Sequence, residues 1–267
     1  MVIAQIDPIS EVLTDKPVIQ LHDIQLTYGA KKTARTVLEN LNLNIQDGEF
    51  VCVLGPSGCG KTSLLKMIAG YERSSAGNIL IDEQPHRGPG PNIGVVFQHA
   101  NLFPWLTVEK NIRYGLKMQK KPKNEQKQIV ERFMDIINLK DAAHLLPHEL
   151  SGGMKQRVAI ARALAPDPKI ILMDEPFGAL DSITRQSLQN ELRNIWQQTN
   201  KTVFFITHDV DEAITLGSRI IILNGKPGKI ILDQQNPLIN RMKDDVDCRA
   251  LKGYNELRQT LLQQLNQ

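Results

Sequence analysis

The sequence has few cysteines, no long apolar run and almost no net charge, and each shortage argues against a class of protein. Its three cysteines, Cys52, Cys59 and Cys248, show neither a paired pattern nor metal-ligand spacing, which fits a reduced cytosolic compartment. No apolar run approaches the roughly 20 residues that span a bilayer. Residues 1–17 carry acidic groups and no continuous apolar core, so we expect no signal peptide. Any membrane role should be peripheral.

The charge balance gives no support for a nucleic-acid partner. Lysine and arginine number 32 against 29 aspartates and glutamates, a net charge of +3, whereas a nucleic-acid-binding face normally appears as a clear cationic excess. Hydrophobic residues make up 41% of the 267 residues and charged residues 23%, which is ordinary for a globular protein with a real core. The chain is long enough for one large domain or two small ones.

Apolar patterning predicts an α/β fold with a mostly parallel core sheet. Alternating apolar residues at 19–28 and 41–45 predict two half-buried strands that form an antiparallel part beside it. A continuous apolar run at 50–54 predicts a strand covered on both faces. Strands then alternate with helices, which is typical of a parallel sheet. The predicted strands are 170–173, 203–206 and 220–223, and the predicted helices are 61–69 and 184–198.

The remaining patterns divide the chain. Between residues 98 and 162 helical patterns replace buried strands, at 108–118, 124–137 and 153–164, which predicts a helical subdomain inserted at about 100–165. We expect a leader at 1–17, a main domain at 18–235 and a helical C-terminal extension at 236–267, where Leu257, Leu261 and Leu265 have helical spacing.

One glycine-rich segment carries a specific chemistry. Residues 55–62 fit the pattern G-x-x-x-x-G-K-[ST], and they lie between a predicted buried strand and a predicted helix. The glycines let backbone N–H groups face phosphate oxygens, Lys61 would reach the β- and γ-phosphates, and the Thr62 hydroxyl would ligate Mg²⁺. A thiol at a helix N-terminus is easily activated, so we expect Cys59 to be reactive. The predicted nucleotide-binding set is Tyr28, Gly55, Pro56, Ser57, Gly58, Cys59, Gly60, Lys61, Thr62 and Ser63.

Polar residues at the ends of other predicted strands suit triphosphate hydrolysis. Asp174 can hold the Mg²⁺ shell while Glu175 polarises a water. Taken alone, two acids after an apolar run have a purely structural role in about half of cases. His208 follows the run 203–206 and is placed to sense a γ-phosphate, although a lone histidine is more often structural. Gln98 could join the Mg²⁺ and water shell. The Tyr28 ring could stack on adenine, although an isolated strand aromatic is by default a core residue.

A second anion-binding turn lies at 150–157. Ser151, Gly152 and Gly153 open a predicted helix, where bare N–H groups and a hydroxyl meet the positive end of the helix dipole. The chain already has a complete phosphate loop. We therefore interpret this turn as serving the nucleotide of another copy.

These motifs together resemble the ATPase subunit of an ATP-binding cassette (ABC) transporter, over about residues 18–235. The motifs match in order: Tyr28, the phosphate loop, Gln98, the signature at 150–157, Asp174 and Glu175, the loop 178–181, and His208. Gly178 stands where many members have serine. The resemblance implies a P-loop NTPase fold, ATP and Mg²⁺ as cofactors, and a head-to-tail pair of ATPase subunits. Residues contributed to the opposite subunit's site would be Ser151, Gly152, Gly153, Gln156 and Asp181.

The resemblance also implies what the ATPase drives: a membrane permease, supplied by an extracytoplasmic substrate-binding protein, with this subunit at the cytoplasmic face. Segments 88–91, 102–108, 175–181 and 207–213 are similar to importers of nitrate, sulfonate, taurine or bicarbonate. Phe103 and Trp105 either anchor the helical subdomain or line a groove for a permease helix. The alternative is a soluble ABC ATPase of nucleic-acid repair or translation, which usually has two cassettes or a long coiled-coil insertion. A small-molecule kinase would not need Ser151 or Asp181.

Overall fold

The computed structural model describes residues 17–29, 33–178, 180–241 and 248–266. The predicted leader therefore lies outside the described residues, apart from Pro17, as does Ala179 of the predicted loop 178–181. No helix in the described part of the chain combines the length and the apolarity that a membrane span requires.

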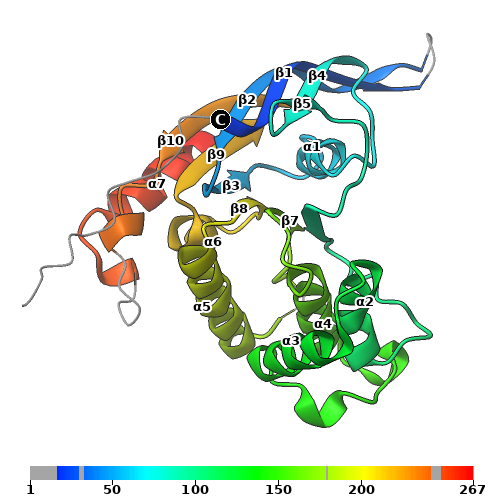
Figure 1. Ribbon diagram of the computed structural model, residues 1–267. Coiled ribbons are helices and arrows are strands. Elements are labelled where there is room, and N and C mark those ends of the chain that lie inside the picture. Colours follow the sequence, from blue (N-terminus) through cyan, green and yellow to red (C-terminus); the bar gives the residue numbers. More distant parts are fainter. Residues whose placement is uncertain (1–16, 30–32, 179, 242–247, 267) are drawn as a thin grey trace, which may run out of the picture.

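A six-stranded sheet forms the core of the molecule, in the order β10-β9-β3-β8-β7-β6 (Figure 1). All neighbouring strands are parallel except β9 and β10. Every residue of β3, β7 and β8 is buried, as their unbroken apolar runs predict. The strands are β3 Phe50–Leu54, β6 Ile93–Val96, β7 Ile170–Asp174, β8 Thr202–Ile206, β9 Arg219–Asn224 and β10 Lys229–Gln235.

A second, antiparallel sheet has the order β2-β1-β4-β5. Its long strands are β1 Pro17–Tyr28 and β2 Arg35–Gln46, and its short ones are β4 Ala76–Ile81 and β5 Gln84–Pro85. Sequence patterns predict β1 and part of β2 but miss β4, because β4 carries no buried residue and so no alternation. Strand β2 also begins before the predicted position 41.

Helices cover both faces of the core sheet (Figure 1). Helix α1 Lys61–Ile68 packs with the antiparallel sheet on one face. Helices α5 Ser182–Thr199, α6 Val210–Leu216 and α7 Tyr254–Leu265 contribute to the core on the other face. No sequence pattern predicts α6, because its seven residues are too few to establish a helical period.

Three further helices pack around an apolar core of their own. They are α2 Val108–Met118, α3 Lys123–Ile136 and α4 Gly152–Leu164. Helix α4 also joins this group to the sheet: a Cβ on Gly94 in β6 would lie 2.9 Å from the Ala163 carbonyl oxygen, while Gln156 contacts the Phe97 carbonyl oxygen just beyond β6. Helix α4 is therefore antiparallel to β6, and its N-terminus points toward the carboxyl edge of the sheet.

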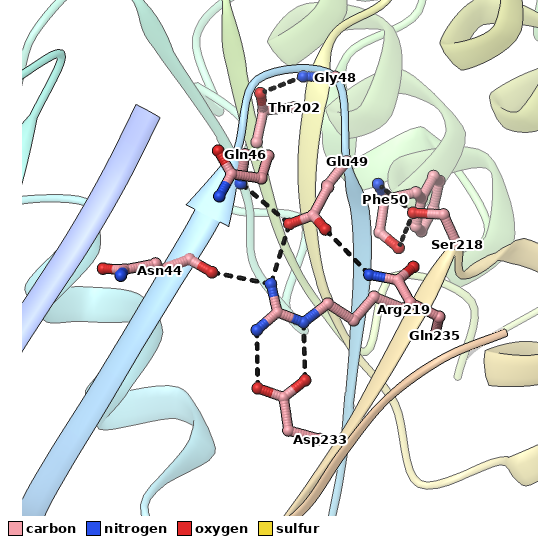
Figure 2. Close-up of polar contacts among 10 residues, drawn as sticks. All are labelled: Asn44, Gln46, Gly48, Glu49, Phe50, Thr202, Ser218, Arg219, Asp233 and Gln235. Carbon is pink, nitrogen blue, oxygen red and sulfur yellow. Dashed lines mark hydrogen bonds and ion pairs between the residues drawn. The ribbon is translucent and has the colours of Figure 1, made fainter. Parts of the chain in front are cut away.

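A charged network joins the two sheets at the opposite, amino edge (Figure 2). Arg219 Nε and Nη2 each donate to Asp233 at 2.7 Å, and Nη1 donates to the Asn44 carbonyl oxygen at 2.8 Å and to Glu49 Oε2 at 3.1 Å. Gln235 Nε2 also donates to Glu49, at 3.4 Å. The paired donors of the guanidinium match a carboxylate geometrically. The network connects β2, β9 and β10 next to the start of β3. It lies at the edge opposite the carboxyl ends of the parallel strands, where ligands bind in such sheets.

Candidate active site

The loop between β3 and α1 follows a path that only glycine permits at two positions. Gly55 has φ 155°, and a Cβ there would lie 2.1 Å from the Leu223 carbonyl oxygen. Gly60 has φ 99°, and a Cβ there would lie 2.6 Å from Leu38 Cδ2. These approaches let the backbone curl at the start of α1, where N–H groups lack helical partners and can bind an anion.

Lys61 holds its ammonium group inside this loop. Its Nζ donates to the Gly55 carbonyl oxygen at 2.7 Å and to the Pro56 carbonyl oxygen at 3.0 Å, and the side chain is buried. An anionic ligand would replace these neutral carbonyls with a charged partner, which makes stronger hydrogen bonds.

Asp174 and Thr62 place oxygen ligands beside the loop. Asp174 ends β7 and is buried, which raises the pKa of its carboxyl group, while a hydrogen bond with Thr62 acts in the opposite direction. Mg²⁺ typically binds through one or two protein oxygens together with substrate phosphates. The Asp174 carboxylate and the Thr62 hydroxyl therefore fit a Mg²⁺ ion shared with a phosphate ligand.

Gln98, Glu175 and His208 meet at the carboxyl edge. Gln98 Nε2 donates to Glu175 Oε2 at 3.2 Å, and His208 Nδ1 lies 3.3 Å from the same oxygen. Glu175 adopts a left-handed φ of 45°, uncommon for a residue other than glycine, and its backbone N–H donates to the Ile206 carbonyl oxygen at 3.0 Å. The three residues follow adjacent strands β6, β7 and β8, which brings them together. An amide and an imidazole thus orient a carboxylate that can accept a proton from water.

Tyr28 lies at the end of β1, on the same side of the molecule as the phosphate loop. Its hydroxyl oxygen lies 3.2 Å from Ser63 Oγ, and the residue is 43% exposed. Partial burial is the largest cause that raises the pKa of the Tyr28 phenol, and a hydrogen bond with Glu72 raises it further. The exposure departs from the default expectation of a core aromatic and leaves the ring accessible for stacking on a base.

The turn that begins α4 is open to solvent. Ser151 is the N-cap, and its Oγ accepts from the Met154 N–H at 3.3 Å. A Cβ on Gly152 would meet nothing within 4 Å, so packing within this chain does not require a glycine there. Asp181 is also exposed and caps α5 by accepting from the Thr184 N–H at 2.9 Å, a hydrogen bond that lowers the pKa of the Asp181 carboxyl group.

Gln156 departs from the expectation that it reaches a partner's nucleotide. Its side chain is 2% exposed, and Nε2 donates to the Phe97 carbonyl oxygen at 3.1 Å. The structure thus places Gln156 in a contact within its own subunit, where it anchors α4 next to Gln98. Helical spacing alone could not reveal this, because the partner lies 59 positions away.

Lys226 lies near the phosphate loop, a position that no sequence pattern predicts. It lies in the turn between β9 and β10, and a Cβ on Gly58 would lie 4.0 Å from Lys226 Nζ. The same turn packs against the loop so closely that a Cβ on Gly228 would lie 1.9 Å from the Cys59 carbonyl oxygen. The approach of this turn to the phosphate loop depends on the fold.

Cys59 is not the activated thiol that its position at a helix N-terminus predicts. Its side chain is fully buried, and burial raises the pKa of the thiol even though Lys61 acts in the opposite direction. Because the thiolate is the reactive form, iodoacetamide at neutral pH should leave Cys59 largely unmodified in the native protein, with ATPase activity retained. Peptide mass spectrometry measures this, with guanidinium-denatured protein as the control in which Cys59 reacts. Alkylation of native Cys59 as fast as in the denatured control would contradict the prediction.

The sequence matches a protein family described as ABC transporter over residues 38–178. An aliphatic sulfonates import ATP-binding protein of Bacillus cereus is 46% identical, over 89% of this chain and 92% of that protein. A nitrate import ATP-binding protein of Synechocystis is 44% identical, over 79% and 80%. A dimeric ATP-binding cassette solved in a post-hydrolysis state with ADP and Pi has 35% identity and a TM-score of 0.75, over 81% and 98%. This likeness confirms the predicted P-loop NTPase fold class.

Proposed function

The chain belongs to the ATP-binding cassette transporter family and is an ATPase, and from this premise we propose that it is the ATP-hydrolysing subunit of an import system. It pairs with a second ATPase subunit, of the same or a sister chain, around two ATP molecules, and it drives a membrane permease. The observation that carries the proposal is the shared contact of Gln98 and His208 with one oxygen of Glu175.

ATP binding uses the two sheets together. Tyr28 stacks on the adenine, and residues 55–62 with Ser63 hold the phosphates. Thr62, Gln98 and Asp174 would hold the Mg²⁺ ion, Asp174 through a water molecule. When bound, the ion would supply positive charge that stabilises the transferring phosphoryl group. Lys61, already inside the loop, adds its charge at the same phosphates.

Glu175 is the general base. A water oxygen attacks the γ-phosphorus, the bond from that phosphorus to the β–γ bridging oxygen breaks, and ADP departs with the electron pair. The proton of the attacking water passes to Glu175. Gln98 and His208 hold the carboxylate in place for this transfer, and His208 senses the γ-phosphate.

Each subunit covers the nucleotide of the other. Ser151, Gly152 and Gly153 close over the partner's ATP, and Asp181 lies at the seam between subunits. Three observations support this arrangement. The N-terminus of α4 is exposed, it points toward the carboxyl edge, and packing within this chain does not require a glycine at 152. The dimeric relative that binds ADP and Pi also supports it. ATP favours the closed pair and hydrolysis releases it, so the γ-phosphate biases a two-state element.

The permease contact lies just beyond Gln98. The Phe103 ring centroid is 4.5 Å from that of Tyr114 and 5.7 Å from that of Trp105, and the Arg162 guanidinium lies 5.2 Å from the Phe103 centroid. Phe103 thus packs into the helical subdomain, whereas Trp105 is 72% exposed. We assign Trp105 to the contact with a cytoplasmic permease helix, and we propose that the subunit lies at the cytoplasmic face of the membrane.

The transported solute belongs to the sulfonate and taurine or the nitrate and bicarbonate type of anion. The names of the two bacterial relatives, which mention aliphatic sulfonates and nitrate, support this assignment. An extracytoplasmic binding protein would deliver it to the permease, so no residue of this chain would contact it. The rival role in nucleic-acid repair or translation draws no support from these relatives.

Co-purification tests the transporter role. The tagged chain, recovered from detergent-solubilised membranes of its own host, should bring down a membrane-spanning permease, and Trp105→Ala should reduce that recovery because it removes the exposed ring. Met118→Ala is the matched control, since Met118 is an exposed apolar residue of the same subdomain. Recovery without any membrane-spanning protein would contradict the proposal.

A further inference from the structure

The described part of the C-terminal extension, residues 236–241 and 248–266, contacts both ends of α6. At the end of α6, the buried Asn236 donates through Nδ2 to the Ile214 carbonyl oxygen at 2.8 Å and to the Gly217 carbonyl oxygen at 2.7 Å. In the last turn of α6, Thr215 Oγ1 lies 3.1 Å from Cys248 Sγ. Helix α6 is therefore held by residues that follow it by about 20 to 30 positions.

The start of α6 is held by two residues of α7. Tyr254 donates its hydroxyl to Asp211 Oδ1 at 2.6 Å, and Arg258 Nε donates to the same oxygen at 2.7 Å. Burial by itself would raise the pKa of Asp211, but these two hydrogen bonds, together with the charges of Arg258 and Arg249, hold the pKa below its ordinary value. The carboxylate therefore stays ionised, and charge-assisted hydrogen bonds of this kind are the stronger class.

Helix α7 is a fixed support for these two donors. Tyr254, Leu257 and Leu261 are all buried in the core shared with the sheet, and the helix packs against both α6 and β9. In Figure 1, α7 lies at the side of the molecule away from helices α2, α3 and α4. Burial of three side chains along one helix face leaves little freedom for it to shift.

The position of α6 is transmitted to His208 by a compact turn. Asp209 Oδ1 accepts from the Asp211 N–H at 2.8 Å, and the Asp209 N–H donates to Thr207 Oγ1 at 3.0 Å. Thr207 Oγ1 in turn donates to Glu212 Oε2 at 2.6 Å. These hydrogen bonds thus link residues 207–212, with His208 between the bonded residues.

His208 depends on this turn because its own side chain is 68% exposed and has little packing around it. We propose that the C-terminal extension is a positioning element for hydrolysis: Tyr254 and Arg258 hold Asp211, and Asp211 keeps His208 within reach of Glu175. The proposal rests on the roles proposed above for His208 and Glu175. Misplacement by about 1 Å far from the reacting atoms can lower a rate by about 100-fold, so a small shift of α6 matters.

The test is the full-length double variant Tyr254→Phe, Arg258→Met, in which both side chains keep most of their volume. We expect kcat to fall by about 10-fold, within the range that misplacement causes, while the KM and Kd for ATP stay within about 2-fold because the phosphate loop is untouched. When Arg258→Lys replaces Arg258→Met in the double variant, part of the lost kcat should return, because the lysine keeps a cation near Asp211. Lys252→Met, an exposed cation of the same extension, is the matched control and should behave as wild type.

A second measurement separates positioning from general stability. Amide hydrogen exchange in α6 should speed up in the double variant while exchange in β3 and β8 stays unchanged, because only local opening is favoured. The effects of Asp211→Asn and Arg258→Met on kcat should also fail to add, since both remove the same contact.

Three outcomes would overturn the proposal or its premise. Wild-type kcat in the double variant, with His208→Ala inactive, would overturn the positioning role and leave the proposed hydrolytic site intact. A parallel loss of ATP binding, or faster exchange throughout the core, would mean that the extension only stabilises the fold. Wild-type kcat in His208→Ala would instead overturn the role given to His208 under the proposed function.

Discussion

Glu175→Gln is expected to lower kcat for ATP hydrolysis by about 10²- to 10⁴-fold, the contribution typical of a general base, while leaving ATP binding intact. The amide keeps the shape of the carboxylate, and its oxygen can still accept the hydrogen bond that Gln98 donates at 3.2 Å. It cannot accept the proton of the attacking water. Steady-state turnover and ATP affinity, measured on the same preparation, separate the two effects.

The same substitution should trap the paired state. If hydrolysis is what separates two subunits, blocking it should leave them closed around ATP, and size exclusion with Mg-ATP should show about twice the monomer mass. Glu131→Gln, an exposed carboxylate on α3, is the control and should elute as wild type. A Glu175→Gln protein that binds ATP but elutes only as monomer would contradict the sandwich arrangement.

Ser151→Arg is expected to abolish turnover while sparing ATP binding by the separated monomer. The long side chain would occupy the open space beside Gly152, where a Cβ meets nothing within 4 Å. It would thereby prevent this turn from closing over the partner's nucleotide. We expect activity to fall by more than about 100-fold, as for a misassembled site. Turnover and monomer affinity for ATP are the two measurements.

A matched control accounts for the lost helix cap. Ser151 caps α4, and removal of an N-cap costs about 1 kcal/mol. Thr107 caps α2 in the same subdomain by accepting from the Lys110 N–H at 3.4 Å, so Thr107→Arg removes a comparable cap away from the proposed seam and should retain basal ATPase activity. If Ser151→Arg instead lost ATP binding as a monomer, Ser151 would serve its own nucleotide.

Chemistry that depends on neighbouring residues could be predicted. The buried runs of β3, β7 and β8, each followed by a polar group, placed the phosphate loop, Asp174, Glu175 and His208 at strand ends, and adjacent parallel strands then had to bring them to one edge. Strand β4 and helix α6 were missed because their burial patterns are too weak or too short for a period to be recognised.

Properties that depend on distant contacts could not be predicted. Cys59 has the local setting of a reactive thiol, but the fold buries it beneath the turn at Gly228, and burial decides its pKa. Gln156 lies in the signature, but its amide turns inward to the end of β6. In both cases a segment far along the chain supplies the environment.

The sequence by itself determined the phosphate loop, the acidic pair and the signature turn, because each depends only on residues that are adjacent in the chain. Only the tertiary structure decided that Gln98 and His208 share one oxygen of Glu175. It likewise decided that Tyr254, 43 positions beyond Asp211, holds the helix that follows His208. Such contacts arise from packing between segments, and packing depends on the whole fold.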